Sequence, residues 1–408
     1  MKLLITISRL ITGLVFIFSG AVKAMDPLGS AFKFGDYFQA FNLGFLQFSA
    51  LPLAVILCTV EFLAGFSLIT GYRIRTGIWA VMIMMLIFTP LTFVLALTNP
   101  VSDCGCFGDA IHLTNWQTFF KNIIILVFAI ILLRYRKEIH MRYSAMTEWL
   151  IISGMGVIMI GFSWFNLRYL PVVDFLPYTT GTYIPGKMVV PDGKPVDRYE
   201  TTFIYEKDGA RKEFTLDNYP ADDTSWVFVD QKSVLVQKGY QPPIHGLSIH
   251  SVYNDDLTEL ILFDEMYSLL MISPKLEKAG VEKLRKGFEL GYHCMANGIP
   301  FYILSASGSN YLKAFDNGLL FSSVDETTLK TMVRSNPGYI LLRNGTIVGK
   351  WSWRTVPDNN WFTGDMESKQ LEMMNNRIGV FTVIILILTL ALGIMLLHIL
   401  LNKKSDIK

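Results

Sequence analysis

Residues 91–120 read LTFVLALTNPVSDCGCFGDAIHLTNWQTFF, and they place two cysteines one residue apart in a short polar loop between two long apolar runs. The apolar runs decide the fold, because a helix needs about 20 mainly apolar residues to cross the hydrocarbon core of a membrane. The chemistry expected of Cys104 and Cys106 depends on the side of the membrane that they face, since disulfides persist outside the cytoplasm and are rare within it. The topology therefore has to be known before the chemistry.

The whole chain is apolar for its length. Of its 408 residues, 51% are hydrophobic and only 17% are charged, and the formal net charge of +2 gives no reason to expect a nucleic-acid partner. Six stretches qualify, or nearly qualify, as transmembrane helices, although Lys121 interrupts the fourth near one end. These stretches are 3–22, 51–70, 78–97, 116–133, 149–166 and 378–401. The sequence predicts a multi-pass membrane protein in contact with lipid.

Basic residues beside the apolar stretches predict its orientation. One set of flanks is rich in them: Lys2, Arg9, Arg73, Arg75, Arg134, Arg136, Lys137, Arg142, Lys403, Lys404 and Lys408. The alternate flanks hold only Lys23, Lys33, Lys121, Arg168 and Arg377. Because basic loops stay in the cytoplasm, we expect a bacterial inner-membrane protein with both termini in the cytoplasm. The cysteine loop and a large extracytoplasmic domain would lie on the opposite side of the membrane. The N-terminal run also fits a cleaved signal peptide, which would leave this sidedness unchanged.

The outward segment has the composition of a folded globular unit. Residues 168–243 are interpreted as β-rich, with strands at 203–205, 214–216, 226–229 and 233–237. Strands and helices then alternate, and the last pair of strands encloses Asn344-Gly345, the strongest short hairpin signal. These elements are a strand at 268–272, a helix at 276–295, a strand at 301–305, a helix at 326–333 and strands at 339–343 and 346–351. In the first outward loop, Phe34, Phe38 and Phe41 indicate a helix that lies on the membrane surface or packs over the bundle.

Three interpretations of the cysteine pair stay open. Two cysteines separated by one residue can form a disulfide only where the chain bends, and Gly105, which tolerates a positive φ, permits the bend. We expect such a ring to be strained and readily reduced, and it removes little entropy from the unfolded chain, which favours thiol–disulfide exchange over a structural disulfide. The third interpretation is a Cu(I) or Zn²⁺ site that adds Asp103, Asp109 and His112 to the two thiolates.

Two further residues in the second predicted helix are candidates. Glu61 is a carboxylate inside the membrane, which is costly and therefore indicates function, although a protonated or Lys23-paired structural contact explains it equally well. Cys58 lies three residues earlier on the same helix face, where it would either relay electrons to the loop or simply pack. Cys294, near the end of a predicted helix, is interpreted as a packing residue.

The order of strands and helices after about residue 244, ending in RSNPGYILLRNGTIVGKW, is similar to the thioredoxin fold, and HGLSI at 245–249 resembles the lead-in strand of its membrane-anchored branch. The resemblance covers residues 244–355. It implies that Pro337 is the proline, usually cis, that opens the penultimate strand at the partner-docking edge. The family's Cys-x-x-Cys belongs at 272–278, where this chain reads ISPKLEK, so the domain lacks a dithiol of its own.

Residues 1–140 resemble the DoxX family and its methylamine-utilisation branch, MauE. The resemblance rests on RLITGLVFIFSGAVKAMDPLG at 9–29, on Glu61 and on CGCFGD at 104–109, which includes Phe107. It implies an outward-facing thiol-redox or quinone-linked role, with a quinone as the cofactor to consider.

The resulting prediction is a membrane α-helical bundle with an extracytoplasmic β-rich segment and an α/β domain. Its parts are a four-helix membrane domain at 1–140, a fifth helix at 149–166, the β-rich segment at 168–243, a thioredoxin-like domain at 244–355 and a sixth helix at 378–401. We expect thiol–disulfide exchange through Cys104 and Cys106 with periplasmic protein dithiols or a thioredoxin-like carrier. The supporting residues are Gly105, Phe107, Asp103, Asp109, Glu61 and Cys58, with Pro337 for docking. The alternatives are a non-enzymatic scaffold or assembly factor, and a metal chaperone.

Overall fold

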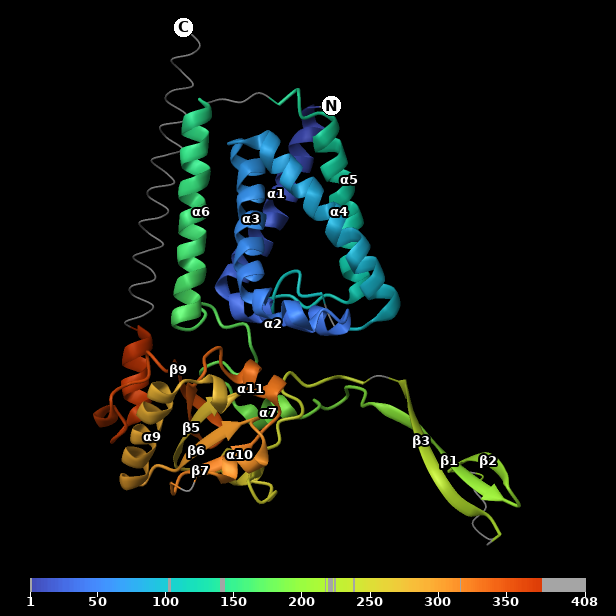
Figure 1. The fold of residues 1–408 in the computed structure, drawn as a ribbon, viewed down its shortest axis with the longest axis vertical. Coiled ribbons are helices and arrows are strands. Elements are labelled where there is room, and N and C mark those ends of the chain that lie inside the picture. Colours follow the sequence, from blue (N-terminus) through green and yellow to red (C-terminus); the bar gives the residue numbers. More distant parts are fainter. Residues whose placement is uncertain are drawn as a thin grey trace.

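The structure, a computed structural model, describes residues 2–375 apart from 102–103, 140–143, 217, 219–222, 224, 238 and 316. Asp103 and the sixth predicted helix at 378–401 therefore lie outside the described residues. The described chain forms a bundle of long helices and, beyond one end of that bundle, a unit built around a mixed β-sheet (Figure 1).

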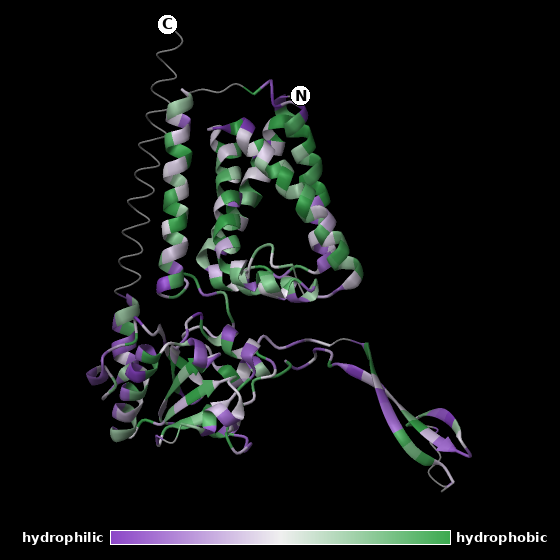
Figure 2. Ribbon diagram, viewed as in Figure 1, coloured by the Kyte–Doolittle hydropathy of each residue, from purple (hydrophilic) through white to green (hydrophobic). Residues whose placement is uncertain are grey.

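Five helices are long and apolar enough to cross a membrane, and hydrophobic residues run along their length (Figure 2). They are α1 (Lys2–Met25), α3 (Ala50–Thr70), α4 (Ile74–Thr98), α5 (Asn115–Arg134) and α6 (Ala145–Arg168). These helices confirm the first five apolar stretches, each of which is longer in the structure by a few residues.

Helices α1 and α3 approach each other closely because glycines stand at their contact. A Cβ atom on Gly20 would lie 2.6 Å from the carbonyl oxygen of Cys58 and from the backbone nitrogen of Phe62. Small residues let helix backbones meet in this way inside a membrane. The close approach brings the C-terminal part of α1 against the part of α3 that carries Glu61.

A short helix, α2 (Pro27–Ala40), lies across the end of the bundle nearest the second unit (Figure 1). Asp26 caps it, since its carboxylate accepts a hydrogen bond from the backbone of Gly29 at 2.8 Å, and Pro27 occupies the first helical position. Ala31 and Phe38 are buried against α3. The predicted helix in this loop therefore packs over the bundle; a single-turn 3₁₀ segment, η1 (Gly44–Ser49), joins it to α3.

The second unit contains a six-stranded sheet in the order β4-β7-β6-β5-β8-β9. Strands β5, β6 and β7 are parallel, β4 and β8 run antiparallel to them, and β9 pairs antiparallel with β8 at the sheet edge. The strands are β4 (His250–Ser251), β5 (Tyr267–Ser273), β6 (Phe301–Ser305), β7 (Leu320–Ser323), β8 (Gly338–Arg343) and β9 (Thr346–Ser352). The helices are α7 (Ile184–Met188), α8 (Thr258–Leu262), α9 (Val281–Ala296), α10 (Ser309–Lys313) and α11 (Glu326–Met332), with 3₁₀ turns η2 (Leu276–Lys278) and η3 (Asn359–Trp361). We call this part the α/β unit.

Two hydrophobic clusters fill the two faces of this sheet. One contains Phe301, Trp351 and Cys294, and the other contains Leu270, Ile340 and Leu329. Both clusters draw on chain outside the predicted range of 244–355. The additional residues are Tyr178, Ile184, Phe362 and Met366.

Three local predictions in the α/β unit were wrong. The helix predicted at 276–295 begins only at Val281, because Gly280 has a φ of +87° that interrupts the helical path. The lead-in strand predicted at 245–249 is not a strand, and only His250–Ser251 pairs with the sheet. Strand β7 was missed, since its four residues, LFSS, are too short and too polar to give a strand signal.

A separate three-stranded sheet projects from the α/β unit (Figure 1). Its strands, in the order β2-β1-β3, are β1 (Arg198–Lys207), β2 (Ala210–Thr215) and β3 (Val227–Gln237). Asp208 and Gly209 form the turn between β1 and β2 with positive φ angles. The two strands predicted at 226–229 and 233–237 are one continuous strand, β3, whose register with β1 shifts at two irregularities.

Candidate functional site

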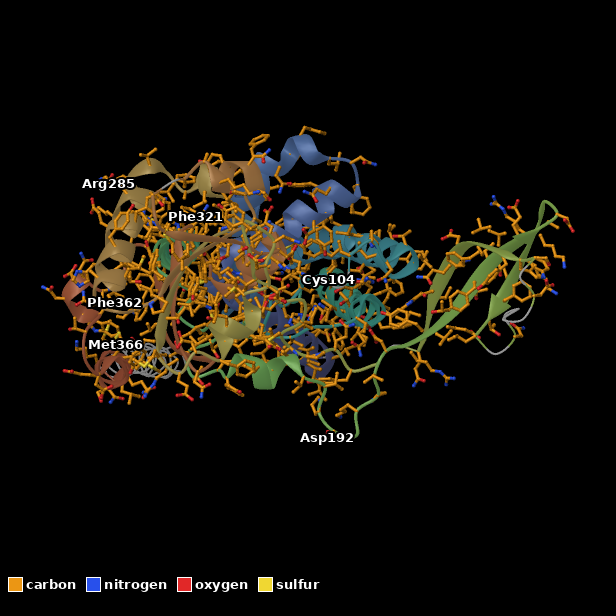
Figure 3. The ribbon with its side chains drawn as sticks, turned by 90° about the horizontal axis from the view of Figure 1, so that it is seen from below. Cys104, Asp192, Arg285, Phe321, Phe362 and Met366 are labelled. Atoms are coloured by element: carbon orange, nitrogen blue, oxygen red, sulfur yellow. A yellow bond between two sulfur atoms is a disulfide. The ribbon has the colours of Figure 1, made fainter. Side chains whose placement is uncertain are left out.

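The cysteine loop lies at the end of the bundle that faces the α/β unit. Cys104 and Cys106 are joined by a disulfide with Cα atoms 5.5 Å apart (Figure 3 labels Cys104). Gly105 takes a φ of +62°, and the backbone of Gly108 donates a hydrogen bond to its carbonyl oxygen at 3.0 Å. A side chain on Gly105 would also meet Lys33, whose Cγ atom would be 3.0 Å from the added Cβ. The tight bend thus depends on a glycine at this position.

Two helices hold the disulfide from either side through backbone contacts. The hydroxyl of Tyr37, in α2, donates to the carbonyl oxygen of Cys104 at 2.6 Å. Ser19, in α1, places its hydroxyl 2.8 Å from the carbonyl oxygen of Cys106 and 2.9 Å from Glu61 Oε2. Since a hydroxyl has one proton, Ser19 can donate to only one of these acceptors at a time. The loop is therefore connected directly to the charged groups inside the bundle.

Phe107 anchors the loop in the bundle. Its ring packs edge-on against Phe18 with 5.4 Å between ring centroids, and the Lys121 ammonium lies 4.4 Å from the centre of the same ring. Lys121, which seemed only to interrupt an apolar stretch, thus faces the loop, where a cation over an aromatic face is stabilising.

Glu61 is paired with Lys23 inside the membrane unit. The Lys23 ammonium is 2.8 Å from both carboxylate oxygens, and it also donates to Ser19 at 3.1 Å. Lys23 and Glu61 are only 7% and 3% exposed, so neither charge is solvated by bulk water. This is the Lys23-paired arrangement that the sequence left open. Because burying an ion pair is costly and rarely adds net stability, its location one hydroxyl away from Cys106 points to more than packing.

A pocket of about 110 Å³ lies between the helices beneath the loop. Both cysteines and Gly105 line its end beside the loop, and Lys23, Glu61, Lys121 and Asn122 are among its polar lining residues. The rest of its wall is largely apolar and comes from α1, α3, α4 and α5. These apolar residues include Phe16, Leu57, Met85, Phe88, Leu91, Leu95 and Ile125. The disulfide is therefore placed against a cavity that is apolar on most sides and carries a few fixed polar groups.

From the other side, Arg334 of the α/β unit reaches the membrane unit. Its Nε lies 2.7 Å from Asp26 and its Nη2 lies 2.7 Å from Asp109. Burial would lower the pKa of Arg334, but the two carboxylates outweigh it and raise that pKa. For Asp109, burial raises the pKa of the carboxyl and the Arg334 charge opposes the rise. Asp109, predicted as a supporting residue, is thus the loop's contact with the α/β unit.

The peptide bond between Asn336 and Pro337 is cis, as the sequence predicted. Asn336 connects this turn to the segment at 272–278, since it donates to the carbonyl oxygen of Lys275 at 3.1 Å and accepts from Ser273 at 2.6 Å. Residues 272–278, which stand where the thioredoxin family has its dithiol, instead carry polar groups that hydrogen-bond to this turn.

The remaining cysteines are packing residues. Cys58 is fully buried beside Ala24 and Met159, and its thiol donates to the Val55 carbonyl at 3.2 Å. Within the described residues it does not line the pocket. Cys294 is fully buried in the α/β unit, and burial raises the pKa of its thiol to about 12. No group of three or more His, Cys, Asp or Glu side chains that could hold a metal ion is found among the residues that the structure describes.

The helices and the site together define a membrane protein with several apolar helices and a paired cysteine loop. Residues 1–135 match a family model described as methylamine utilisation protein MauE, and residues 199–238 match a domain of unknown function (DUF8463). The first match supports a MauE-like membrane family for the helical part, and the second falls on the projecting sheet of β1 to β3. No curated protein and no solved structure matches the chain.

Several residues at the site were missed by the sequence interpretation. Ser19 lies four residues before Lys23, already named as a possible partner of Glu61, and this spacing on one helix face was a usable signal for Ser19. Tyr37 and Arg334 gave none, because their partners lie 67 and 225 residues away along the chain.

Proposed function

We propose that this chain is a membrane thiol–disulfide oxidoreductase that exchanges disulfides with extracytoplasmic proteins through Cys104 and Cys106. The observation that carries the proposal is the position of the disulfide, between the outer surface and an internal pocket. A structural disulfide needs neither a cavity behind it nor a buried ion pair beside it. A redox pair needs access to two reaction partners, and this position offers one on each side.

The exchange reaction is balanced without further groups. A client thiolate attacks one sulfur of the disulfide, the other sulfur leaves as a thiolate, and a mixed disulfide links client and enzyme. The second client thiol then releases the enzyme dithiol, so the client loses two electrons and two protons overall. Run in reverse, the same pair reduces a client disulfide.

The pocket supports a lipid-soluble quinone as the second reaction partner. A quinone headgroup is apolar with two carbonyl oxygens, which suits a largely apolar wall with donors such as Lys121 and Asn122. Bound there, a quinone would accept the two electrons and two protons of the reduced pair. Lys23 and Glu61 line the pocket together with Cys106 and reach its backbone through Ser19, and they are suited to moving a proton at that point.

The α/β unit would dock the client or its carrier. Its parallel β5-β6-β7 core with antiparallel β8 and β9, and its cis-Pro337 beside 272–278, support the thioredoxin-like interpretation. Since it holds no dithiol at that edge, its contribution would be recognition, with the chemistry left to the bundle.

The test is to trap the mixed disulfide in intact cells. Cys104→Ser and Cys106→Ser each remove one thiol, so one of them should accumulate a covalent client complex that a reductant dissolves. Cys294→Ser makes the same chemical change at a buried cysteine and should trap nothing. A scaffold would show no trapped client in either variant, and a metal chaperone would purify with stoichiometric copper or zinc that the double variant loses.

The quinone step has its own control pair. Leu91→Trp, which points bulk into the pocket wall, should slow reoxidation of the reduced protein by a short-chain quinone in nanodiscs. Leu86→Trp, on the same helix but 60% exposed, should leave that rate unchanged. Equal rates in both variants would remove the quinone from the proposal without touching the exchange reaction.

A further inference from the structure

Arg334 belongs to the α/β unit, but its ion pairs are with the membrane unit. Its guanidinium is 6% exposed and binds Asp26, the N-cap of α2, and Asp109, the end of the cysteine loop. A third contact runs back to its own unit, where Nη1 donates to the carbonyl oxygen of Lys330. The Phe32 ring of α2 also lies 5.3 Å from the guanidinium carbon. One side chain thus joins the α/β unit, α2 and the cysteine loop.

The two carboxylates need this cation. Asp26 and Asp109 accept from the same guanidinium, so they lie close together in a partly buried space, and like charges in such a place repel each other strongly. A forked guanidinium is the side chain that satisfies two such carboxylates at once. Without it, the start of α2 and the end of the loop would be driven apart.

The movement of α2 would reach the disulfide directly. Tyr37 of α2 holds the carbonyl oxygen of Cys104, and Lys33 of α2 lies against Gly105. These contacts cover one side of the loop for as long as α2 stays in place. Ala31 and Phe38 pack α2 on α3, and Arg334 fixes the N-terminal end of α2 through Asp26.

We propose that Arg334 is a positioning residue that keeps α2 closed over the Cys104–Cys106 disulfide when the α/β unit is docked. Release of Arg334 would then open the disulfide to a reaction partner from outside. The biological meaning of this gate rests on the proposed function, but the gate itself concerns only access to a disulfide and is tested without any client.

The experiment measures how fast the disulfide of the purified full-length chain in nanodiscs is reduced by tris(2-carboxyethyl)phosphine, a charged reductant that stays in water. The phosphine is oxidised to its oxide with an oxygen atom from water, and the disulfide takes up two electrons and two protons. Arg334→Gln should accelerate the reduction about tenfold, the effect of losing one charge-assisted contact. Arg343→Gln removes an arginine of the same unit from an exposed pair with Glu367 and should leave the rate unchanged.

Variants that rebalance the charges at this contact separate a positioning role of Arg334 from a general loss of folding. Arg334→Gln combined with Asp109→Asn removes the repulsion and should return the rate toward that of the native chain. Arg334→Lys, which keeps the charge but not the fork, should give an intermediate rate. In Arg334→Gln alone, acid should slow the reaction relative to Arg343→Gln as the carboxyls protonate; Lys33 and His112 also face Asp109 and move the midpoint without changing this direction.

Two results would overturn the proposal. One is a native rate in Arg334→Gln while Cys294 stays shielded from maleimide, which reports an intact fold. If Arg334→Gln fails to fold, the second is a native rate in Arg334→Lys, which keeps the charge but cannot hold both carboxylates with one planar fork. A faster rate in Arg334→Gln without any trapped client in the cysteine variants would support the gate and reject the exchange function. A native rate together with a trapped client would reject the gate and support the exchange function.

Discussion

The loop at 104–109 and the segment at 272–278 are of comparable length, but only the first contains cysteines. The first carries two cysteines, held by glycines and by hydrogen bonds from α1 and α2, above a pocket within the bundle. The second begins at the end of the buried strand β5, lies beside a cis-proline and contains no cysteine. The thiols and the β-sheet framework thus belong to separate regions, and Arg334 bridges the space between them.

The largest expected difference between the two regions is in thiol reactivity. With a pKa of about 12, the Cys294 thiol should be ionised in about one molecule in 10⁴ at pH 8, and it is also fully buried. After reduction, Cys104 or Cys106 should therefore react with iodoacetamide faster than Cys294 by several orders of magnitude. Mass spectrometry of peptides from the native chain measures both rates. Comparable labelling of Cys294 would mean that the α/β unit opens readily and that its cysteine is not a packing residue.

The ion pair beneath the loop should give the next largest effect. Glu61→Ala leaves the buried Lys23 ammonium with the Ser19 hydroxyl but without a carboxylate, which costs about 3–5 kcal/mol of unfolding free energy. Replacing both residues, as Lys23→Met/Glu61→Leu, should recover most of that stability, and unfolding by SDS measures the difference. If the double variant is stable but loses disulfide exchange, the pair serves chemistry; if it keeps full exchange, the pair is structural.

Much of the fold follows from the sequence because its signals are local. Apolar runs of about 20 residues give the helices α1 and α3 to α6, and Asn344-Gly345 gives the hairpin of β8 and β9. The exceptions also have local causes, since Gly280 delays α9 and the four residues of β7 carry no pattern.

The site could be predicted only in part, because many of its contacts join residues that are far apart in the sequence. The cysteine pair, Gly105 and Glu61 are visible as unusual residues in their surroundings, whereas Tyr37 and Arg334 are ordinary residues in a polar segment. Their importance comes from tertiary contacts that bring α2 and the α/β unit to the loop. A single sequence has no periodicity that encodes such contacts.

The bend of the cysteine loop should be sensitive to a single methyl group. Gly105→Ala forces an L-residue to a φ of +62° and brings its Cβ against Lys33, which should cost about 1–2 kcal/mol. The equilibrium constant for forming the Cys104–Cys106 disulfide in a dithiothreitol buffer should fall by about tenfold for a change of that size. Gly44→Ala is the matched control, because a Cβ there meets nothing within 4 Å. An unchanged equilibrium in Gly105→Ala would show that the loop bends without help from this glycine.

The smallest effect is expected for Asp109→Asn. Burial raises the pKa of this carboxyl despite Arg334, so the folded chain binds the proton more tightly than the unfolded chain does. The stability linked to Asp109 is therefore full below the unfolded pKa and is lost as the pH rises through the folded pKa. Asparagine stays neutral, so Asp109→Asn should change stability by no more than about 1 kcal/mol at pH 7 while Arg334 keeps Asp26 as its partner. Unfolding measured from pH 4 to 8 should show a weaker pH dependence than in the native chain. A steeper loss of stability with rising pH in Asp109→Asn would mean that the charged carboxylate, and not its burial, dominates at the junction of the two regions.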